Sequence, residues 1–260
     1  MSRLKERIPI KIRQTWWELR ELPGWLFSAR RRHDAARLKA LRDIHRGQRC
    51  VIIGNGPSLK QMDLRPLARE YTIGLNRIYL LFEQMGFATT YHVTVNRLVI
   101  EQFLDDLLAI PSVKFMSWKA RDLIPADAPV ILLRSLYRPS FSTNLAWGAW
   151  EGATVTYTAM QIAYHLGFEQ VVLIGVDHNF ATQGEKHKVV TSEGDDPDHF
   201  APDYFGKGTR WQLPDLETSE RAYRMAKAAF EAAGREIVDA TIGGKLQVFR
   251  KVDYNHLFGL

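Results

Sequence analysis

Short apolar runs alternate along the chain with longer stretches that show the 3.6-residue spacing of an amphipathic helix. The apolar runs predict buried strands, and the periodic stretches predict helices that cover them. The expected strands are 49–53, 71–76, 89–96, 114–118, 130–134, 170–180 and 235–241, and the expected helices are 98–108, 154–168 and 216–233. Gly167 and Gly234 stand where the last two helices should end, since glycine adopts the left-handed conformation of a C-terminal cap.

Strands that alternate with helices favour a Rossmann-like α/β fold, a mostly parallel sheet with helices on both faces. In such sheets the ligand binds at the carboxyl ends of the strands, near the point where the strand order reverses. The expected strand ends carry Gly54-Asn55-Gly56, Asn76, Asn96 and Asp177-His178. We therefore expect a single nucleotide-binding domain over residues 49–260, with its ligand site at this edge of the sheet.

The composition is that of a folded, soluble protein, with 46% hydrophobic and 25% charged residues among 260. The single cysteine, Cys50, excludes an intramolecular disulfide and a zinc site built from cysteines, and it suits a reducing compartment. No run of 18 apolar residues is present, and the N-terminus lacks the apolar core of a secretory signal. These features favour a cytoplasmic protein, with peripheral contact to the inner membrane face as an open alternative.

Positive charge is concentrated at the start of the chain, in a basic, tryptophan-rich arm that we place at residues 1–48. The first 50 residues hold 14 Lys and Arg against 5 Asp and Glu, whereas the remaining 210 hold 21 against 24. Because the rest of the chain has no excess of positive charge, no nucleic-acid partner is expected.

The arm is expected to be helical, and its aromatic residues lie among cations. Its three tryptophans are Trp16, Trp17 and Trp25. Pro23-Gly24 predicts a break in any helix there, and residues 34–46 predict a second helix with Asp34 as its cap. Three interpretations stay open. The tryptophans could pack on the chain's own domain or on a second subunit of a homo-oligomer, or they could anchor the arm on an anionic membrane surface. Single-stranded nucleic acid, which also binds aromatic and arginine side chains, is the least favoured of the three.

A glycine-rich turn, Gly54-Asn55-Gly56-Pro57-Ser58-Leu59, follows the first expected strand and enters a helix, which is a setting for a nucleotide phosphate. A dinucleotide fingerprint would need a third glycine where Leu59 stands, and an acidic residue where Asn76 ends the next strand. No Lys-Ser or Lys-Thr pair follows the turn, so the phosphate loop of ATPases is absent as well. The turn therefore predicts a nucleotide site of another kind.

Three asparagines, Asn55, Asn76 and Asn96, fall at the ends of expected strands. A neutral amide both donates and accepts hydrogen bonds, so it can bind a base edge or a ribose without adding charge. One such asparagine is usually a turn residue, but three at one edge favour a ligand site.

Residues 181–214 form a long polar segment with little periodicity, which is typical of a lid that orders over a substrate. A histidine exchanges protons near neutral pH and can act as a general base; His199 lies in this segment, and His178, just before the segment, is a rival candidate. The lid also holds the candidates for binding a departing phosphate, Tyr204, Lys207 and Arg210.

Other titratable residues are expected to have structural roles. Asp195, Asp196 and Asp198 predict a solvated acidic turn, with Mg²⁺ binding beside a diphosphate as the alternative. His92 and His165 lie within an expected strand and an expected helix and are predicted to pack there.

Several motifs resemble those of the bacterial sialyltransferases of glycosyltransferase family 42. They are GNGPSLK, the strand-end asparagines, Thr154 at the start of a helix, LGF-x-x-VVLIGVD and a later histidine. The same motifs are similar to the wider family described as 6-hydroxymethylpterin diphosphokinase MptE-like, whose relatives include the Maf flagellin glycosyltransferases. The resemblance covers about residues 49–245, and the arm lies outside it.

The resemblance to sialyltransferases implies a set of residues that hold a CMP-sugar: Asn55, Gly56, Ser58, Asn76, Asn96 and Thr154. It also implies His199, which precedes Phe200 in the lid, as the general base. From their places at strand ends and in the lid we add four binding candidates, Gly54, Asp177, His178 and Lys207. The sialyltransferases carry two phosphate-binding tyrosines after their Gly-Ile-Asp motif, but here no tyrosine follows Asp177 until Tyr204.

The leading hypothesis is an inverting glycosyltransferase that moves a sugar from a CMP-activated donor to a glycan or glycolipid acceptor, with no further cofactor required. One alternative is an ATP-dependent diphosphokinase of the MptE type, which would use Mg²⁺ with Asp177 as a ligand. Another is a nucleotide-binding protein without catalysis, for which the same asparagines would suffice.

Overall fold

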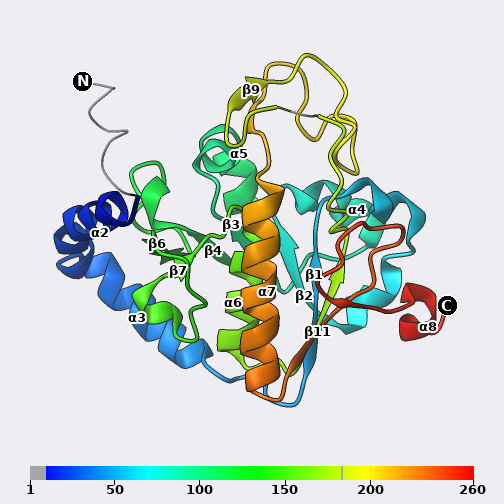
Figure 1. Cartoon of the computed structure of the whole chain (residues 1–260), viewed down its shortest axis with the longest axis horizontal. Helices are drawn as coiled ribbons and strands as arrows, with labels where there is room; N and C mark the ends of the chain where they lie inside the picture. The colour runs from blue at the N-terminus through cyan, green and yellow to red at the C-terminus, as the bar shows by residue number, and fades with distance from the viewer. Residues whose placement is uncertain (1–9, 183) are drawn as a thin grey trace.

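The computed structural model describes residues 10–182 and 184–260. Its centre is a sheet of eight parallel strands in the order β12-β11-β8-β1-β2-β3-β4-β5 (Figure 1). The strands are β1 (Arg49–Ile53), β2 (Tyr71–Leu75), β3 (Tyr91–Thr94), β4 (Val113–Ser117), β5 (Val130–Leu133), β8 (Gln170–Ile174), β11 (Glu236–Asp239) and β12 (Arg250–Lys251). The chain builds the sheet outward from β1 to β5 and then places β8 on the other side of β1. The strand order therefore reverses between β1 and β8.

Helices cover both faces of the sheet, which confirms the predicted Rossmann-like α/β fold. One face carries α6 (Val155–Leu166) and α7 (Leu216–Ala232), which lie in front of the sheet in Figure 1. The other face carries α4 (Phe82–Met85), α5 (Arg97–Ala109), α8 (Tyr254–Phe258) and the 3-10 helices η1 (Pro57–Gln61), η2 (Arg65–Arg69), η3 (Ile78–Leu81) and η4 (Trp118–Ala120). Alternate strand residues serve the two layers, since Cys50 and Ile52 pack with α6 whereas Val51 and Ile53 pack on the opposite side.

Two small ribbons lie outside the main sheet. β6 (Ser135–Leu136) pairs with β7 (Ala149–Trp150), and the 3-10 helix η5 (Leu145–Trp147) lies between them in the chain. β9 (Val189–Thr191) pairs antiparallel with β10 (Arg210–Gln212) inside the segment predicted as a lid. The lid is thus more ordered than its weak periodicity indicates.

The elements that carry continuous apolar runs lie close to their predicted positions. β1 has the predicted bounds, and α6 and α7 differ from them by one or two residues. Gly167 ends α6 in the left-handed conformation, with a φ of 97°, as the cap prediction requires. Gly234 has a φ of 70° just after α7.

The described part of the arm forms α2 (Ile10–Leu26) and α3 (Ala29–Leu41), and two predictions about it are wrong. Pro23 and Gly24 do not break the first helix, which continues to Leu26. A proline there removes only one donor from the helix, and the position is exposed. Asp34 does not cap the second helix, because Ser28 precedes its first turn. Residues 1–9 of the arm lie outside the described residues.

The tryptophans of the arm divide between packing and exposure. Trp25 is buried, and the guanidinium groups of Arg31 and Arg134 lie 4.4 and 5.1 Å from its ring centroid. The ring of Trp17 lies 5.7 Å from that of Tyr137. Trp16 is exposed, so the interpretation that the arm packs on its own domain describes only part of its aromatic surface.

Asp34 binds α3 to the open edge of the sheet. Its buried carboxylate accepts a hydrogen bond from the backbone N–H of Leu132 in β5 at 3.1 Å and another from Arg30. Arg37 donates to the carbonyl of Val130 at 2.8 Å. Because β5 is the last strand of the sheet, these side chains replace the strand that would otherwise bond its edge.

We expect Asp34→Ala to lower the free energy of unfolding by about 1–3 kcal/mol, because it leaves the Leu132 N–H without its acceptor. Urea denaturation followed by circular dichroism measures this loss. The control is Asp105→Ala, which removes an exposed carboxylate on α5 and should change the midpoint little. Equal midpoints for the two variants would mean that the bond at the sheet edge contributes nothing.

None of the helices described in residues 10–182 and 184–260 combines the length and the apolar character that crossing a bilayer requires.

Candidate functional site

A cavity of about 620 Å³ lies at the carboxyl ends of the central strands, where the strand order reverses. Its volume is in the range of small-ligand sites. Nine of the thirteen residues singled out from the sequence line it: Gly54, Asn55, Gly56, Asn76, Asn96, Thr154, Asp177, His178 and His199. The structure therefore brings together residues from β1, β2, β3, β8, α6 and the lid.

The turn after β1 contains glycines because its backbone lies directly against the backbone that follows β8. The N–H of Gly54 donates to Ile174 at 2.8 Å, and the N–H of Gly56 donates to Gly175 at 2.9 Å. A Cβ atom on Gly54 would lie 2.7 Å from the carbonyl carbon of Gly175 and closer still to its oxygen. Only glycine fits this close approach of the two backbones, so Gly54 has a structural role whatever the ligand.

Asp177 lines the cavity, but its carboxylate is hydrogen-bonded to Ser58. The carboxylate of Asp177 accepts from the Ser58 N–H at 3.0 Å and from its hydroxyl at 2.7 Å. Burial raises the pKa of Asp177, and the two bonds from Ser58 act in the opposite direction. The N-terminus of η1, which the sequence offers as a phosphate site, is therefore bound by a carboxylate of the chain itself.

The amides of Asn55 and Asn76 are buried polar groups without a complete set of partners. The side-chain oxygen of each is buried and accepts no hydrogen bond in the described structure. Asn76 also adopts a left-handed backbone with a φ of 47°, which is uncommon for a residue with a side chain. A buried oxygen without a donor costs free energy that a ligand can return by supplying the donor.

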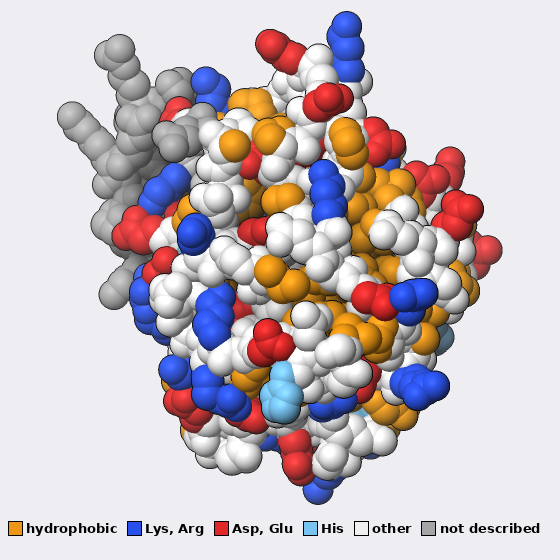
Figure 2. All heavy atoms as spheres, turned by 90° about the vertical axis from the view of Figure 1, so that its right-hand side faces the viewer, with side chains coloured by type: hydrophobic (Ala, Val, Ile, Leu, Met, Phe, Trp, Pro, Cys, Tyr) orange, Lys and Arg blue, Asp and Glu red, His pale blue; other side chains and the backbone are white. Residues whose placement is uncertain are grey.

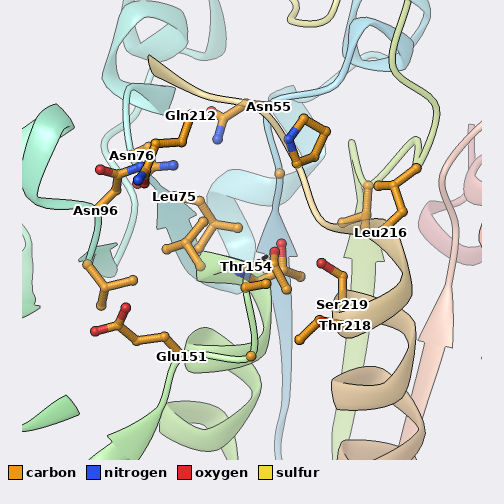
Figure 3. A pocket seen from close by; sticks show the side chains of 18 of the residues that line it. Asn55, Leu75, Asn76, Asn96, Glu151, Thr154, Gln212, Leu216, Thr218 and Ser219 are labelled. Carbon is orange, nitrogen blue, oxygen red and sulfur yellow. Dashed lines mark hydrogen bonds between the residues drawn. The ribbon is translucent and has the colours of Figure 1, made fainter. Parts of the chain in front are cut away.

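Asn96 differs from the other two asparagines because its side chain is partly used. Its oxygen accepts from the N–H of Leu98 at 2.9 Å and caps α5. Figure 3 shows Asn55, Asn76 and Asn96 together at one end of the cavity, with Glu151 apart from them. The predicted group of asparagines thus exists, and two of its members have free acceptors.

The N-terminus of α6 forms another wall of the cavity. Thr154 caps this helix, and its hydroxyl lies 3.3 Å from the hydroxyl of Tyr223 on α7. Burial raises the pKa of Tyr223, so its hydroxyl stays protonated and can donate. His178 is less available, since its Nε2 atom lies 3.2 Å from a carboxylate oxygen of Glu220.

His199 lies between a carboxylate and aromatic rings. Its Nδ1 atom lies 2.8 Å from the carboxylate of Asp196, and its ring stacks on Tyr204 with centroids 4.0 Å apart. In the tautomer whose Nδ1–H donates to Asp196, Nε2 carries the lone pair. The neighbouring Phe200 N–H donates to the carbonyl of Asn55 at 2.9 Å, which ties the lid to the glycine-rich turn.

In the acidic segment of the lid Asp196 and Asp198 are buried and Asp195 is exposed, so the prediction of a solvated acidic turn is wrong for Asp196 and Asp198. Asp196 also accepts from the N–H groups of Asp198 and Phe205, at 2.9 and 3.2 Å. Asp198 accepts from the N–H of Ala181. Among the residues that the structure describes, no three His, Cys, Asp or Glu side chains form a group suited to a metal ion.

The remaining lid candidates do not line the cavity. Tyr204 is fully buried, and its hydroxyl accepts from the backbone N–H of Arg77 at 3.3 Å. Arg210 pairs with Glu101 at 3.2 Å on the outside of the lid, and Lys207 is exposed. The structure thus leaves Tyr204, Lys207 and Arg210, together with Ser58, outside the set that it brings together.

Several lining residues have no motif that predicts them. They include Lys119, Tyr137, Glu151, Gln212, Ser219 and Tyr223. Glu151 accepts a hydrogen bond from the hydroxyl of Ser135 and lies 3.8 Å from the amine of Lys119. Only its place just before the helix cap Thr154 could have indicated Glu151, and nothing local indicates the others.

The fold and the cavity at its strand reversal define the class, a Rossmann-like α/β protein with a ligand-sized site at the carboxyl edge of its sheet. The family model described as 6-hydroxymethylpterin diphosphokinase MptE-like matches residues 29–183, more than half of the chain, so the chain belongs to the MptE-like family. The match includes α3, which the motifs alone placed outside. Among curated proteins no relative matches.

A solved structure with a similar fold is the Maf glycosyltransferase from Magnetospirillum magneticum AMB-1. The two share 16% sequence identity and a TM-score of 0.46, and the similarity covers 85% of this chain but 38% of that protein. The chain thus spans well under half of the length of this neighbour.

Proposed function

We propose that the protein is a glycosyltransferase that moves a sugar, with inversion, from a CMP-activated donor to a glycan or glycolipid acceptor. The observation that carries the proposal is the pair of buried amide oxygens on Asn55 and Asn76, which accept no hydrogen bond in the described residues. Both residues line the cavity, and so does His199, whose ring contacts Asp196. A nucleoside offers the donors that these oxygens lack, through ribose hydroxyls or the amino group of cytosine.

His199 suits the role of general base in this reaction. Its Nε2 atom takes the proton of the acceptor hydroxyl while the acceptor oxygen bonds to the anomeric carbon of the sugar. The bond from that carbon to the phosphate oxygen breaks, and CMP leaves with the electron pair. Asp196 holds the ring in place and stabilises the positive charge that it gains.

The leaving phosphate fits the N-terminus of α6 better than it fits the lid. Thr154 and Thr156 line the cavity at this end of a 12-residue helix, whose unpaired N–H groups and dipole favour an anion. The hydroxyl of Tyr223 lies beside Thr154. Tyr204 and Arg210, which the sequence favours for this task, are bound elsewhere.

The family description favours a second candidate, an ATP-dependent diphosphokinase. A panel of nucleotides in a thermal-shift assay separates the two. A ligand at 100 times its dissociation constant stabilises the fold by about 2.7 kcal/mol. We expect CMP and CDP to raise the melting temperature. A response to ATP with Mg²⁺ and none to CMP would support the kinase and overturn the proposal, and binding without turnover would favour a nucleotide-binding protein without catalysis.

We expect Asn55→Ala to weaken CMP binding about fivefold, since one hydrogen bond to the ligand contributes on the order of 1 kcal/mol. It should not lower the melting temperature of the free protein, because the amide oxygen bonds nothing in the fold and its burial without a donor costs free energy. Asn76→Gly is the matching variant at the second position, since glycine keeps the left-handed backbone.

Asn255→Ala, on the exposed side of α8, serves as the control for both variants. Calorimetric titration with CMP measures the affinities. Unchanged affinity in both variants would show that the asparagines do not bind the nucleotide.

A further inference from the structure

The outer face of α2 exposes a stripe of apolar side chains. Trp16, Leu19 and Phe27 are 55%, 61% and 82% exposed, and Pro23 is exposed between them. Trp16, Leu19 and Pro23 lie on α2, and Phe27 comes just after its last residue, Leu26, where the Phe27 N–H donates to the carbonyl of Pro23. Steps of three and four residues place these four positions on one side of the helix and of the turn that continues it. The stripe runs over about 16 Å at 1.5 Å per residue. On the side facing the domain the helix is already packed, through Trp25 and through Trp17 against Tyr137.

Cations accompany this stripe. The guanidinium of Arg20 lies 5.3 Å from the ring centroid of Trp16, and Arg20 and Arg32 are exposed. The first 50 residues of the chain hold 14 Lys and Arg against 5 Asp and Glu. On the face with α8, away from α2, Figure 2 shows positive and negative side chains mixed. Exposed apolar side chains and an excess of positive charge therefore occur together on the arm.

A second copy of the chain fits this surface poorly. A stable dimer interface buries about 800 Å² per partner and has few charges at its centre. A two-fold axis on the stripe would bring its arginines close to their own copies. Anionic lipid removes that repulsion, because tryptophan rings lie at the depth of the headgroups while arginines bind the phosphates.

We propose that the outer face of α2 binds the surface of an anionic lipid bilayer, with the helix lying parallel to the membrane plane. Trp16, Leu19 and Phe27 enter the headgroup region, and Arg20 stays at the lipid phosphates. Tyr137 connects this helix to the cavity, since it lines the cavity and donates to Glu21 at 2.6 Å. The membrane contact itself depends on neither candidate reaction.

The experiment is sedimentation of the full chain with vesicles of phosphatidylcholine, with and without phosphatidylglycerol. We expect binding to the anionic vesicles only, and weaker binding at high salt. The variant Trp16→Ser/Leu19→Ser/Phe27→Ser should bind at least about tenfold less. Arg20→Gln should lose about fivefold, because one cation at the surface contributes about 1 kcal/mol.

Leu260→Ser is the matched control, since Leu260 is also 55% exposed but stands at the C-terminus, on the opposite side of the molecule from α2 in Figure 1. It should bind vesicles like the parent. Circular dichroism checks that each variant is folded, and Arg20→Gln keeps the test decisive if the triple variant is not. Absence of binding to anionic vesicles, or equal binding by parent and Arg20→Gln, would overturn the proposal. So would a dimer in light scattering that the triple variant dissociates.

Discussion

Replacing His199 by alanine is expected to lower turnover by about 10²–10⁴-fold, the usual contribution of a general base. Binding of CMP should persist, because the asparagines that we assign to the nucleotide lie on other elements. Release of CMP from CMP-sugars measures turnover, and calorimetry measures binding. His199→Asn is the more conservative variant, since its amide can still donate to Asp196 while it lacks a group that accepts the proton.

The Asp196 partner makes this prediction sharper. Asp196→Asn should lower turnover less than His199→Ala does, because the base remains although its orientation is weakened. The double variant should be no slower than His199→Ala alone, since two residues that act as a unit are not additive. His256→Ala, on the exposed face of α8, is the control. Full activity in His199→Ala would exclude His199 as the base and leave His178 as the candidate.

Gly54→Ala is expected to lower the free energy of unfolding by about 3 kcal/mol or more, at the upper end of overpacking effects. Its Cβ atom would meet the backbone of Gly175, where the segments that follow the neighbouring strands β1 and β8 lie side by side. Unlike a side chain, this backbone has no alternative rotamer that would relieve the contact. Domains of this kind are stable by only about 5–15 kcal/mol, so such a loss is a large share. Urea denaturation measures it, and the slope with denaturant should not change.

Alanine variants of two further glycines provide the comparison with Gly54→Ala. Gly194→Ala is the control, since its Cβ atom would meet nothing within 4 Å. Gly56→Ala should be intermediate, because its nearest neighbour is the carboxylate of Asp177, a side chain that can turn away at the cost of its bonds to Ser58. A Gly54→Ala protein as stable as Gly194→Ala would show that the backbone of Gly175 can move away from the added methyl group.

The sequence by itself determined the sheet and the outline of the site. Unbroken apolar runs mark strands buried on both faces, and such a run defines β1 to the residue. Glycine and asparagine at strand ends report backbone requirements that are local, which is why Gly54 and Asn76 could be singled out. The parallel fold then brings those ends to one edge, so the strand-end pattern predicted seven of the residues that line the cavity, and the family resemblance added Thr154 and His199.

Only the tertiary structure decided which polar side chains face the cavity and which bind the fold. Tyr204 and Asp196 belong to a polar segment, but burial against Arg77 and His199 makes the first a packing residue and the second a positioning one. The sequence suggests Asp34 as a helix cap, but in the fold its carboxylate accepts a hydrogen bond from the backbone of β5. Some of these contacts join residues that are far apart in the chain, and others form only because a loop folds back on itself. Local periodicity carries no information about either kind of contact. A side chain's neighbours follow from packing, whereas its backbone preferences can be read from the residue itself.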